Sequence, residues 1–291
     1  MDTVAEISCW GSGRAEAVRA MDAAFKEMER IERVFSKFDK NSEVSRINSH
    51  AGTEEAVVSP EVLRLIQDSI YYSKISNGSF DITVGPLMEI WGFVHKNHTV
   101  PSRETIENNL RHVGYRNIFI DIERSSIRFL DKDTKIDLGA IAKGYAVDRA
   151  RQVLISHGIK NSLINLGGNI FAMGQAPGDK NWKIGVQDPR NKNRLLQKLE
   201  LKDKAVSTSG NYERFFILNG KRYSHIINPV TGEPCQGIIS VTVVTDSAEA
   251  SDALSTAIFV MGIEKGIELA RSLKDIEVAI LDEYGKITSY P

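Results

Sequence analysis

Apolar residues in the first third of the chain recur every three to four positions, which is the period of amphipathic helices. The first such run spans residues 12–35, and Ser12 can cap its start. A second helix is predicted after Ser59-Pro60, because serine favours the N-cap and proline the first turn, and Gly78 lies just past its expected end. A third, short helix is expected over residues 102–112. The polar stretch of residues 36–48 predicts a loop that ends in a short turn.

From residue 118 onward many apolar residues alternate with polar ones, which is typical of strands with one buried side. A hairpin is predicted over residues 118–122 and 127–130. Further strands are expected at residues 162–165, 182–187, 196–201, 214–218 and 238–245, and a closing hairpin at 278–281 and 286–289. Helices are expected from the segment 137–144 to about residue 156, and over residues 247–261 and 263–273.

The order of these elements favours one fold class. Helices are interspersed with short strands, without the regular strand–helix alternation of parallel sheets. Strands with one buried side suit antiparallel sheets, so we predict an α+β fold of antiparallel sheets with packed helices. No repeat and no linker rich in proline or serine divides the chain. We therefore expect residues 1–291 to form one unit of two intimately packed lobes.

Composition and charge narrow the functional classes. The chain has 37 basic and 38 acidic residues, and a net charge of −1 argues against nucleic acid or an anionic membrane as the main partner. The two cysteines, Cys9 and Cys235, are far apart, which excludes a disulfide scaffold and a thiolate zinc cage. No apolar run approaches the roughly 20 residues that span a bilayer, and no targeting signal is visible. An enzyme or a binding protein remains.

Two segments offer groups that suit phosphates. The pair Gly167-Gly168 directly follows an expected strand, and its N–H groups can cradle a phosphate, although such a pair more often forms only a tight turn. In the segment 137–144 an acid and Lys143 flank a helix start, where free N–H groups attract anions. The alternative there is that Asp137 caps the helix and Lys143 is solvated.

Two further segments suit a metal ion and a base. Asp252 and Thr256 are four residues apart and share one face of the expected helix, and their oxygens suit Mg²⁺. The alternative is an aspartate that complements the helix dipole and a threonine bonded to its own helix. His225, at the end of a strand, can act as a general base or be structural. No Ser/His/Asp order, HExxH or GxSxG motif supports a hydrolase.

These segments, together with others along nearly the whole chain, resemble in their order the ApbE family of Mg²⁺-dependent FAD:protein FMN transferases. The resemblance is carried by residues 1–3, 35–38, 41–48, 78–87, 137–145, 165–169, 225–229 and 252–256. It implies an ApbE-like, T-fold-like architecture. It also implies a reaction in which FAD is split at its pyrophosphate, FMN is transferred to a Thr or Ser hydroxyl of an acceptor flavoprotein, and AMP leaves.

The resemblance also assigns residues. The magnesium ligands fall on Asp252, Thr256 and the carbonyl of Ala140, and His225 matches a histidine that assists the acceptor hydroxyl, so that His225 and Asp252 are the expected catalytic pair. The flavin-nucleotide contacts fall on Met1, Phe38, Ser79, Phe80, Asp81, Asp137, Lys143 and Ile226. The expected partner is an acceptor flavoprotein, such as an Nqr- or Rnf-type redox subunit or an FMN-binding domain.

The chain departs from the family pattern at three places. Phe38 stands where many members have Tyr and some have Asn, which affects the balance between transfer and plain FAD hydrolysis. Asp2 replaces the family glycine, and no lipoprotein signal or lipobox cysteine is present, since Cys9 lies downstream. If a signal was trimmed, we expect a periplasmic lipoprotein of the inner membrane, attached only through a lipid anchor that this chain lacks. Otherwise we expect a cytoplasmic protein. Two alternative functions are an FAD pyrophosphatase that gives FMN and AMP, and a non-catalytic FAD-binding protein.

Overall fold

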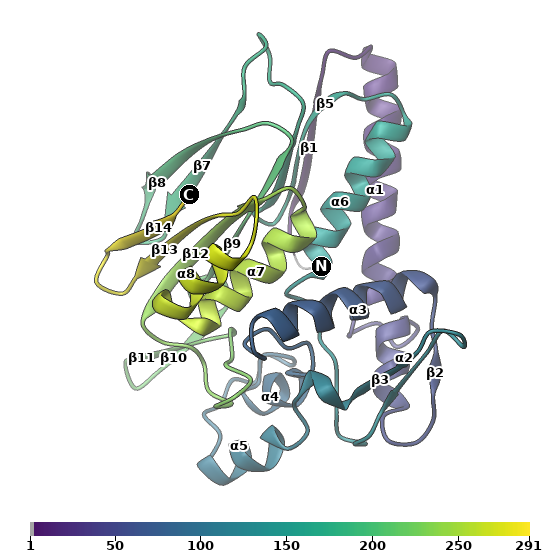
Figure 1. Ribbon diagram of the computed structural model, residues 1–291, viewed down its shortest axis with the longest axis vertical. Helices are drawn as coiled ribbons and strands as arrows, with labels where there is room; N and C mark the ends of the chain where they lie inside the picture. The colour runs from purple at the N-terminus through teal and green to yellow at the C-terminus, as the bar shows by residue number, and fades with distance from the viewer. Residues whose placement is uncertain (1–2) are drawn as a thin grey trace.

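The computed structural model describes residues 3–291, apart from the side chain of residue 192, and its centre is a seven-stranded sheet (Figure 1). The strand order is β1-β5-β6-β9-β12-β13-β14, and each neighbouring pair is antiparallel. The strands are β1 (Ala5–Trp10), β5 (Asn161–Leu166), β6 (Asn169–Met173), β9 (Lys204–Gly210), β12 (Ile238–Thr245), β13 (Glu277–Asp282) and β14 (Ile287–Tyr290). The predicted α+β fold of antiparallel sheets and packed helices is confirmed.

Successive side chains of each strand point to opposite faces of the sheet, and different elements pack on the two faces. Ala205 of β9 belongs to the large core that the sheet shares with the helices α1, α6, α7 and α8. The next residue, Val206, points into a smaller core beneath the hairpin of β7 and β8. The covering elements are α1 (Arg14–Phe35), α6 (Ala142–Ser156), α7 (Ala248–Met261), α8 (Ile263–Ser272), β7 (Trp182–Asp188) and β8 (Asn191–Leu201). The face under α6 and α7 carries the candidate site.

A second group of elements packs at one end of the sheet, in the lower half of Figure 1. It consists of α2 (Glu43–Ser49), β2 (Ala56–Val57), α3 (Pro60–Ile75), α4 (Gly85–Ile90), α5 (Arg103–Leu110), the 3₁₀ turn η1 (Tyr115–Asn117), β3 (Ile118–Asp121), β4 (Ser126–Phe129), β10 (Phe215–Leu218) and β11 (Lys221–Ser224). A separate aromatic core holds the β10–β11 hairpin against α4 and α5, with Trp91 and Phe93 at its centre. The helix α3 connects this group to α7.

Most of the predicted elements are present, and the errors have local causes. The polar stretch 36–48 is not a loop throughout, because α2 begins at Glu43, where the Ser42 side chain accepts the Ser45 N–H and caps the helix. The predicted cap at Ser12 is wrong, since α1 begins one residue after Gly13 and has no side-chain cap. The strands β1, β2, β6, β9 and β11 lie outside every predicted strand, and the short helix α4 lies outside every predicted helix.

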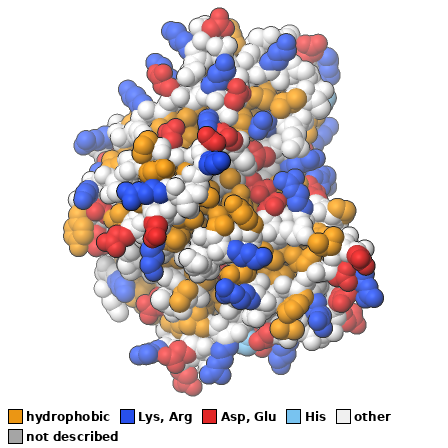
Figure 2. Space-filling model, in the orientation of Figure 1, with side chains coloured by type: hydrophobic (Ala, Val, Ile, Leu, Met, Phe, Trp, Pro, Cys, Tyr) orange, Lys and Arg blue, Asp and Glu red, His pale blue; other side chains and the backbone are white. Residues whose placement is uncertain are grey.

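The surface agrees with the near-neutral composition. Figure 2 shows basic and acidic side chains interspersed over the visible face, without a large field of one sign. Within residues 3–291, no helix combines the length and the apolar character that crossing a membrane requires.

Candidate active site

The helices α6 and α7 touch through their backbones at Gly144. A Cβ atom at this position would lie 2.1 Å from the carbonyl oxygen of Ala248 and 2.8 Å from the Cβ of Asp252. The close approach lets the Gly144 N–H donate to Asp252 Oδ2 over 2.9 Å. This N–H would otherwise bond the carbonyl four residues earlier. Among residues 3–291 no N–H donates to the Ala140 oxygen, so this carbonyl is left open to a ligand.

The other oxygen of Asp252 faces a cation, although the side chain is only 4% exposed. Lys143 Nζ lies 3.1 Å from Asp252 Oδ1, so this lysine is not simply solvated. Asn169, at the start of β6, joins both groups when its amide is oriented to satisfy both ends. It then donates to Asp252 Oδ1 over 3.1 Å and to Ser207 Oγ over 2.6 Å, and accepts from Lys143 Nζ over 3.1 Å. Asp252, Lys143, Gly144 and Asn169 are called the α6–α7 junction below.

Thr256 completes the set of oxygens. It lies one turn after Asp252 on α7, half-buried, and its Oγ1 is 3.1 Å from Ser209 Oγ of β9. Asp252, Thr256 and the Ala140 carbonyl together offer a carboxylate, a hydroxyl and a peptide oxygen, which are ligands that a hard divalent cation such as Mg²⁺ prefers. These residues therefore fit the metal that the family resemblance implies.

His225 follows β11, and the backbone carbonyl of Arg214 fixes the tautomer of its ring. Its N–H donates to the Arg214 carbonyl over 2.9 Å, and its Nδ1 lies 3.1 Å from the same oxygen. Because a carbonyl only accepts, Nδ1 carries the proton and Nε2 has a free lone pair. Burial, together with the Arg214 charge, lowers the pKa of His225 to about 4. The ring is therefore neutral at pH 7 and can accept a proton at Nε2.

Asp137 lies in the same charged surroundings. Its carboxylate pairs with Lys37 Nζ at 2.5 Å and accepts the Gly139 N–H over 2.9 Å. Burial alone would raise the pKa of Asp137, but the Lys37 charge outweighs it and holds the pKa below its usual value. Asp137 is not the helix cap, since the N-cap of α6 is Ile141. The charges of Asp137 and Lys143 both act on His225, which links these residues to the junction.

Asp81 differs from the other two aspartates because it accepts hydrogen bonds from uncharged groups alone within residues 3–291. Its Oδ1 accepts the Thr83 N–H over 2.8 Å and the Thr83 hydroxyl over 2.6 Å, and its Oδ2 accepts the Tyr115 N–H over 2.7 Å. Burial raises the pKa of Asp81. The carboxylate thus fastens the loop after α3 to the segment before β3. Ser79, two residues earlier, is half-buried.

Two predicted contacts have buried side chains. Phe80 packs edge-on against Tyr72, and Ile226 belongs to the main core, so neither side chain faces solvent. The Phe80 N–H donates to Ser76 Oγ, and the Ile226 carbonyl accepts the Cys235 N–H. Among residues 3–291 this leaves the Phe80 carbonyl and the Ile226 N–H without partners, as the groups through which these residues can meet a nucleotide.

Phe38 and the glycine pair complete the predicted residues. Phe38 is 62% exposed, and Lys37 Nζ lies 5.2 Å from its ring centre, so the ring has a surface free for stacking. The pair Gly167-Gly168 is the tight turn between β5 and β6. Both N–H groups are already used, by the Val4 carbonyl and by Asn165 Oδ1, so the turn interpretation holds over the phosphate cradle. Met1 lies outside the described residues.

Sequence reasoning missed three charged or polar residues of the site. Asn169 and Lys37 lie inside the segments that carry the resemblance, but the resemblance assigns no role to either. Arg214, whose carbonyl holds His225, has no sequence signal. Asn169 lies 83 residues before its partner Asp252, and Lys37 lies 100 residues before its partner Asp137. No local sequence pattern encodes contacts over such separations.

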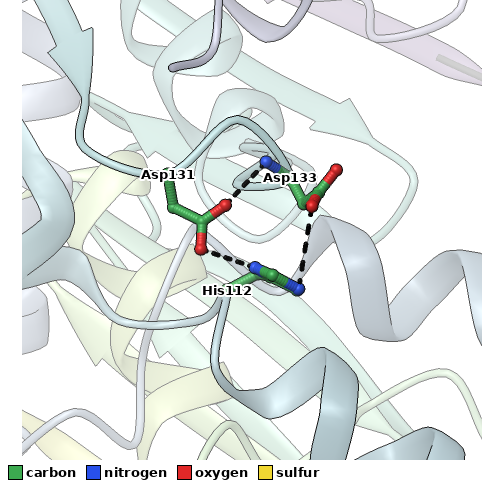
Figure 3. A group of neighbouring side chains, drawn as sticks. All are labelled: His112, Asp131 and Asp133. Atoms are coloured by element: carbon green, nitrogen blue, oxygen red, sulfur yellow. Dashed lines mark hydrogen bonds and ion pairs between the residues drawn. The ribbon is translucent and has the colours of Figure 1, made fainter.

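A second cluster of ionisable side chains consists of His112, Asp131 and Asp133 (Figure 3). His112 Nδ1 is 2.6 Å from Asp131 Oδ2, and Asp131 Oδ1 accepts the Asp133 N–H over 2.8 Å. Asp133 Oδ2 is 3.9 Å from His112 Nε2, beyond hydrogen-bond distance. The Thr134 hydroxyl also donates to the His112 carbonyl. The cluster ties the segment after α5 to the segment after β4 and needs no ion for that role.

The comparisons with known proteins identify the family of the chain. A family model described as the ApbE family matches residues 1–280. Similar curated proteins include the FAD:protein FMN transferases of Vibrio cholerae serotype O1, 34% identical over 249 residues that cover 84% of this chain and 74% of that protein, and of Treponema pallidum, 31% identical over 284 residues that cover 92% and 78%.

Solved structures give the same result for the fold. The crystal structure of the ApbE protein from Thermotoga maritima matches with a TM-score of 0.90 at 36% identity, over 98% of this chain and 96% of that chain. The flavin transferase ApbE from Vibrio cholerae matches with a TM-score of 0.89 at 30% identity, over 100% of this chain and 94% of that chain. The protein is a member of the ApbE family.

Proposed function

We propose that the protein transfers FMN from FAD to a Thr or Ser hydroxyl of an acceptor flavoprotein and releases AMP. The observation that carries this proposal is the pairing of a cation-holding carboxylate, Asp252, with a neutral histidine, His225, in one charged neighbourhood. Splitting a pyrophosphate needs positive charge at the phosphates, and transfer to a hydroxyl needs a base.

We further propose that Mg²⁺ is held by Asp252, Thr256 and the Ala140 carbonyl. The ion, when bound, offsets the negative charge of the pyrophosphate. Lys143 now pairs with Asp252 at 3.1 Å, and a divalent cation at the carboxylate would release its ammonium to the phosphates. The Asn169 amide oxygen accepts a hydrogen bond from Lys143, and its N–H donates to Asp252, so this side chain orients both partners.

His225 supplies the base. Its Nδ1–H is held by the Arg214 carbonyl, which leaves Nε2 to take the proton of the acceptor hydroxyl. The hydroxyl oxygen then bonds to the FMN phosphorus, the bond from that phosphorus to the bridging oxygen breaks, and AMP leaves with the electron pair. A pKa near 4 keeps this base unprotonated at all pH values above about 5.

A second candidate function is hydrolysis of FAD to FMN and AMP. One observation favours it, namely the exposure of Phe38, whose ring is 62% accessible and uncovered by other parts of the described chain. A site left open at the flavin admits water, and water can replace the acceptor hydroxyl as the nucleophile.

The deciding experiment separates the two reactions. Wild type is incubated with FAD, Mg²⁺ and an FMN-binding domain of an Nqr- or Rnf-type redox subunit, our proposed acceptor class. Transfer gives a covalent FMN mass shift on the acceptor and an equal amount of AMP, and excess EDTA stops both. Free FMN at the same rate without acceptor would favour the pyrophosphatase. Asp246→Ala serves as a surface control. It removes an aspartate whose side chain is 65% exposed and pairs with Lys204, so it should leave transfer unchanged.

A further inference from the structure

The β10–β11 hairpin carries an exposed apolar strand. β10 reads Phe215-Phe216-Ile217-Leu218, four apolar residues in succession. Ile217 is 61% exposed, Leu218 44% and Phe215 37%, whereas Phe216 turns inward and stacks on Tyr223 at 5.1 Å. Runs of exposed apolar residues are disfavoured on protein surfaces unless they bind something. The strand therefore has the character of a docking surface.

The backbone of β10 is equally available. The hairpin forms a sheet of its own two strands, and residues 3–291 supply no third. The His225 N–H bonds the Arg214 carbonyl, and Phe216 pairs with Tyr223, so the register turns the N–H and C=O groups of Phe215 and Ile217 away from β11. An unpaired edge of this kind accepts an extended segment as an additional strand.

The β10–β11 hairpin directly adjoins His225, the proposed base. β10 begins one residue after Arg214, and β11 ends one residue before His225. A strand advances about 3.3 Å per residue, so the edge from Phe215 to Leu218 covers roughly 10 Å beside the site. A protein hydroxyl cannot reach His225 without its own flanking residues lying within that distance. The acceptor is the one macromolecule that the reaction requires at this place.

We propose that β10 docks the acceptor flavoprotein, which lays an extended segment along its edge and thereby brings a Thr or Ser hydroxyl to His225. The proposal rests on the proposed function and names the partner's contact surface. The apolar side chains of the segment would cover Ile217 and Leu218. Lys221 and Arg222 of β11 add positive charge to the hairpin, so acidic residues in the acceptor segment complement it.

The test compares two exposed isoleucines. Ile217→Asp places a charge on the docking edge, and the matched control Ile122→Asp alters a 67% exposed isoleucine next to the β3–β4 hairpin. Transfer to the acceptor domain is followed at saturating FAD over a series of acceptor concentrations. We expect Ile217→Asp to raise the acceptor KM about tenfold with kcat and the FAD KM unchanged, and Ile122→Asp to behave as wild type.

Three results would overturn the proposal. An unchanged acceptor KM for Ile217→Asp, with the melting temperature of wild type, would remove β10 from the acceptor site. A dimer in sedimentation that Ile217→Asp dissolves, again with an unchanged acceptor KM, would assign β10 to a second copy of the chain. A wild type that cleaves FAD but labels no acceptor would overturn the proposed function itself, and the docking surface with it. If Ile217→Asp unfolds, Ile217→Ser takes its place in the same measurement.

Discussion

Two buried aspartates stand in two regions of the molecule and behave differently. Asp252, in the α6–α7 junction, is 4% exposed, and Asp81, in the loop after α3, is 8% exposed. The donors to Asp81 are the neutral groups of Thr83 and Tyr115. The donors to Asp252 include the ammonium of Lys143. Burial by itself therefore does not mark a reactive carboxylate.

The difference lies in what a ligand could displace. The neutral donors to Asp81 are two backbone N–H groups and the Thr83 hydroxyl, and none of them is a mobile cation, so we expect this carboxylate to hold the loop in place. The Lys143 ammonium can move away on a flexible stem, so Asp252 can exchange one cation for another. The predictions below separate a carboxylate that holds a cation from one that holds the backbone.

The largest effect is expected from Asp252→Ala. Removing this carboxylate takes away the proposed metal ligand, and we expect kcat/KM for transfer to fall more than about a hundredfold. Asp252→Asn is the partner variant, because it keeps an acceptor for the Gly144 N–H but removes the charge. It should fold like wild type by circular dichroism and be almost as inactive as Asp252→Ala. Full turnover by either variant would exclude a metal at this carboxylate.

Asp81→Ala should act on stability instead. It leaves buried N–H groups of Thr83 and Tyr115 without an acceptor, so we expect a loss of about 2–4 kcal/mol in the free energy of unfolding. Below its melting temperature the variant should retain transfer within about tenfold of wild type. Denaturant unfolding with activity measured on the same samples tests this. A stable but inactive Asp81→Ala would make the two aspartates alike.

Asn169→Ala sharpens the comparison within the junction. Asn169 touches Asp252 and Lys143 but supplies no predicted metal ligand, so we expect the Mg²⁺ concentration for half-maximal activity to rise about tenfold. The direct readout is Mg²⁺ binding to the protein without FAD, by calorimetry, which should weaken in parallel. Equal Mg²⁺ affinity in both proteins would reduce Asn169 to a packing residue.

Glu249→Gln should have the smallest effect. Glu249 lies in the first turn of α7, 6% exposed, and burial with the nearby Asp68 raises its pKa from 4.5 to about 7. The unfolded chain binds fewer protons than the folded one between these values, so the stability from this group is present below pH 4.5 and lost as pH rises through 7. Between pH 5 and pH 8 the free energy of unfolding of wild type should fall by about 1–2 kcal/mol more than that of Glu249→Gln. Urea unfolding at both pH values measures this difference.

The sequence predicts the longer helices well, because their signals are local, but it misses the short helices α2 and α4. Ser59-Pro60 marks the start of α3, and the period of apolar residues places α6 and α7. The strand β9 escapes prediction because its buried side chains include Ser207, which faces α7 and bonds Ser251 over 2.7 Å. A polar residue on the buried face hides the alternation that would reveal a strand.

The site is predictable where its residues lie on one element. The spacing of four places Asp252 and Thr256 on the same face of α7, and the structure has them so. The partners that hold the carboxylate are not local, since Gly144 lies 108 residues away. Only the packing of α6 on α7 brings them together, and no period in the sequence encodes the distance between two helices.

The absence of a side chain at Gly144 has a consequence for how the protein tolerates change. The separation of α6 and α7 is set there by backbone against backbone, with no intervening atoms that could be repacked. Even alanine, the smallest possible step, would drive the helices apart and carry Asp252 away from Lys143. A position without any reactive group thus has as little freedom to vary as the carboxylate that it positions.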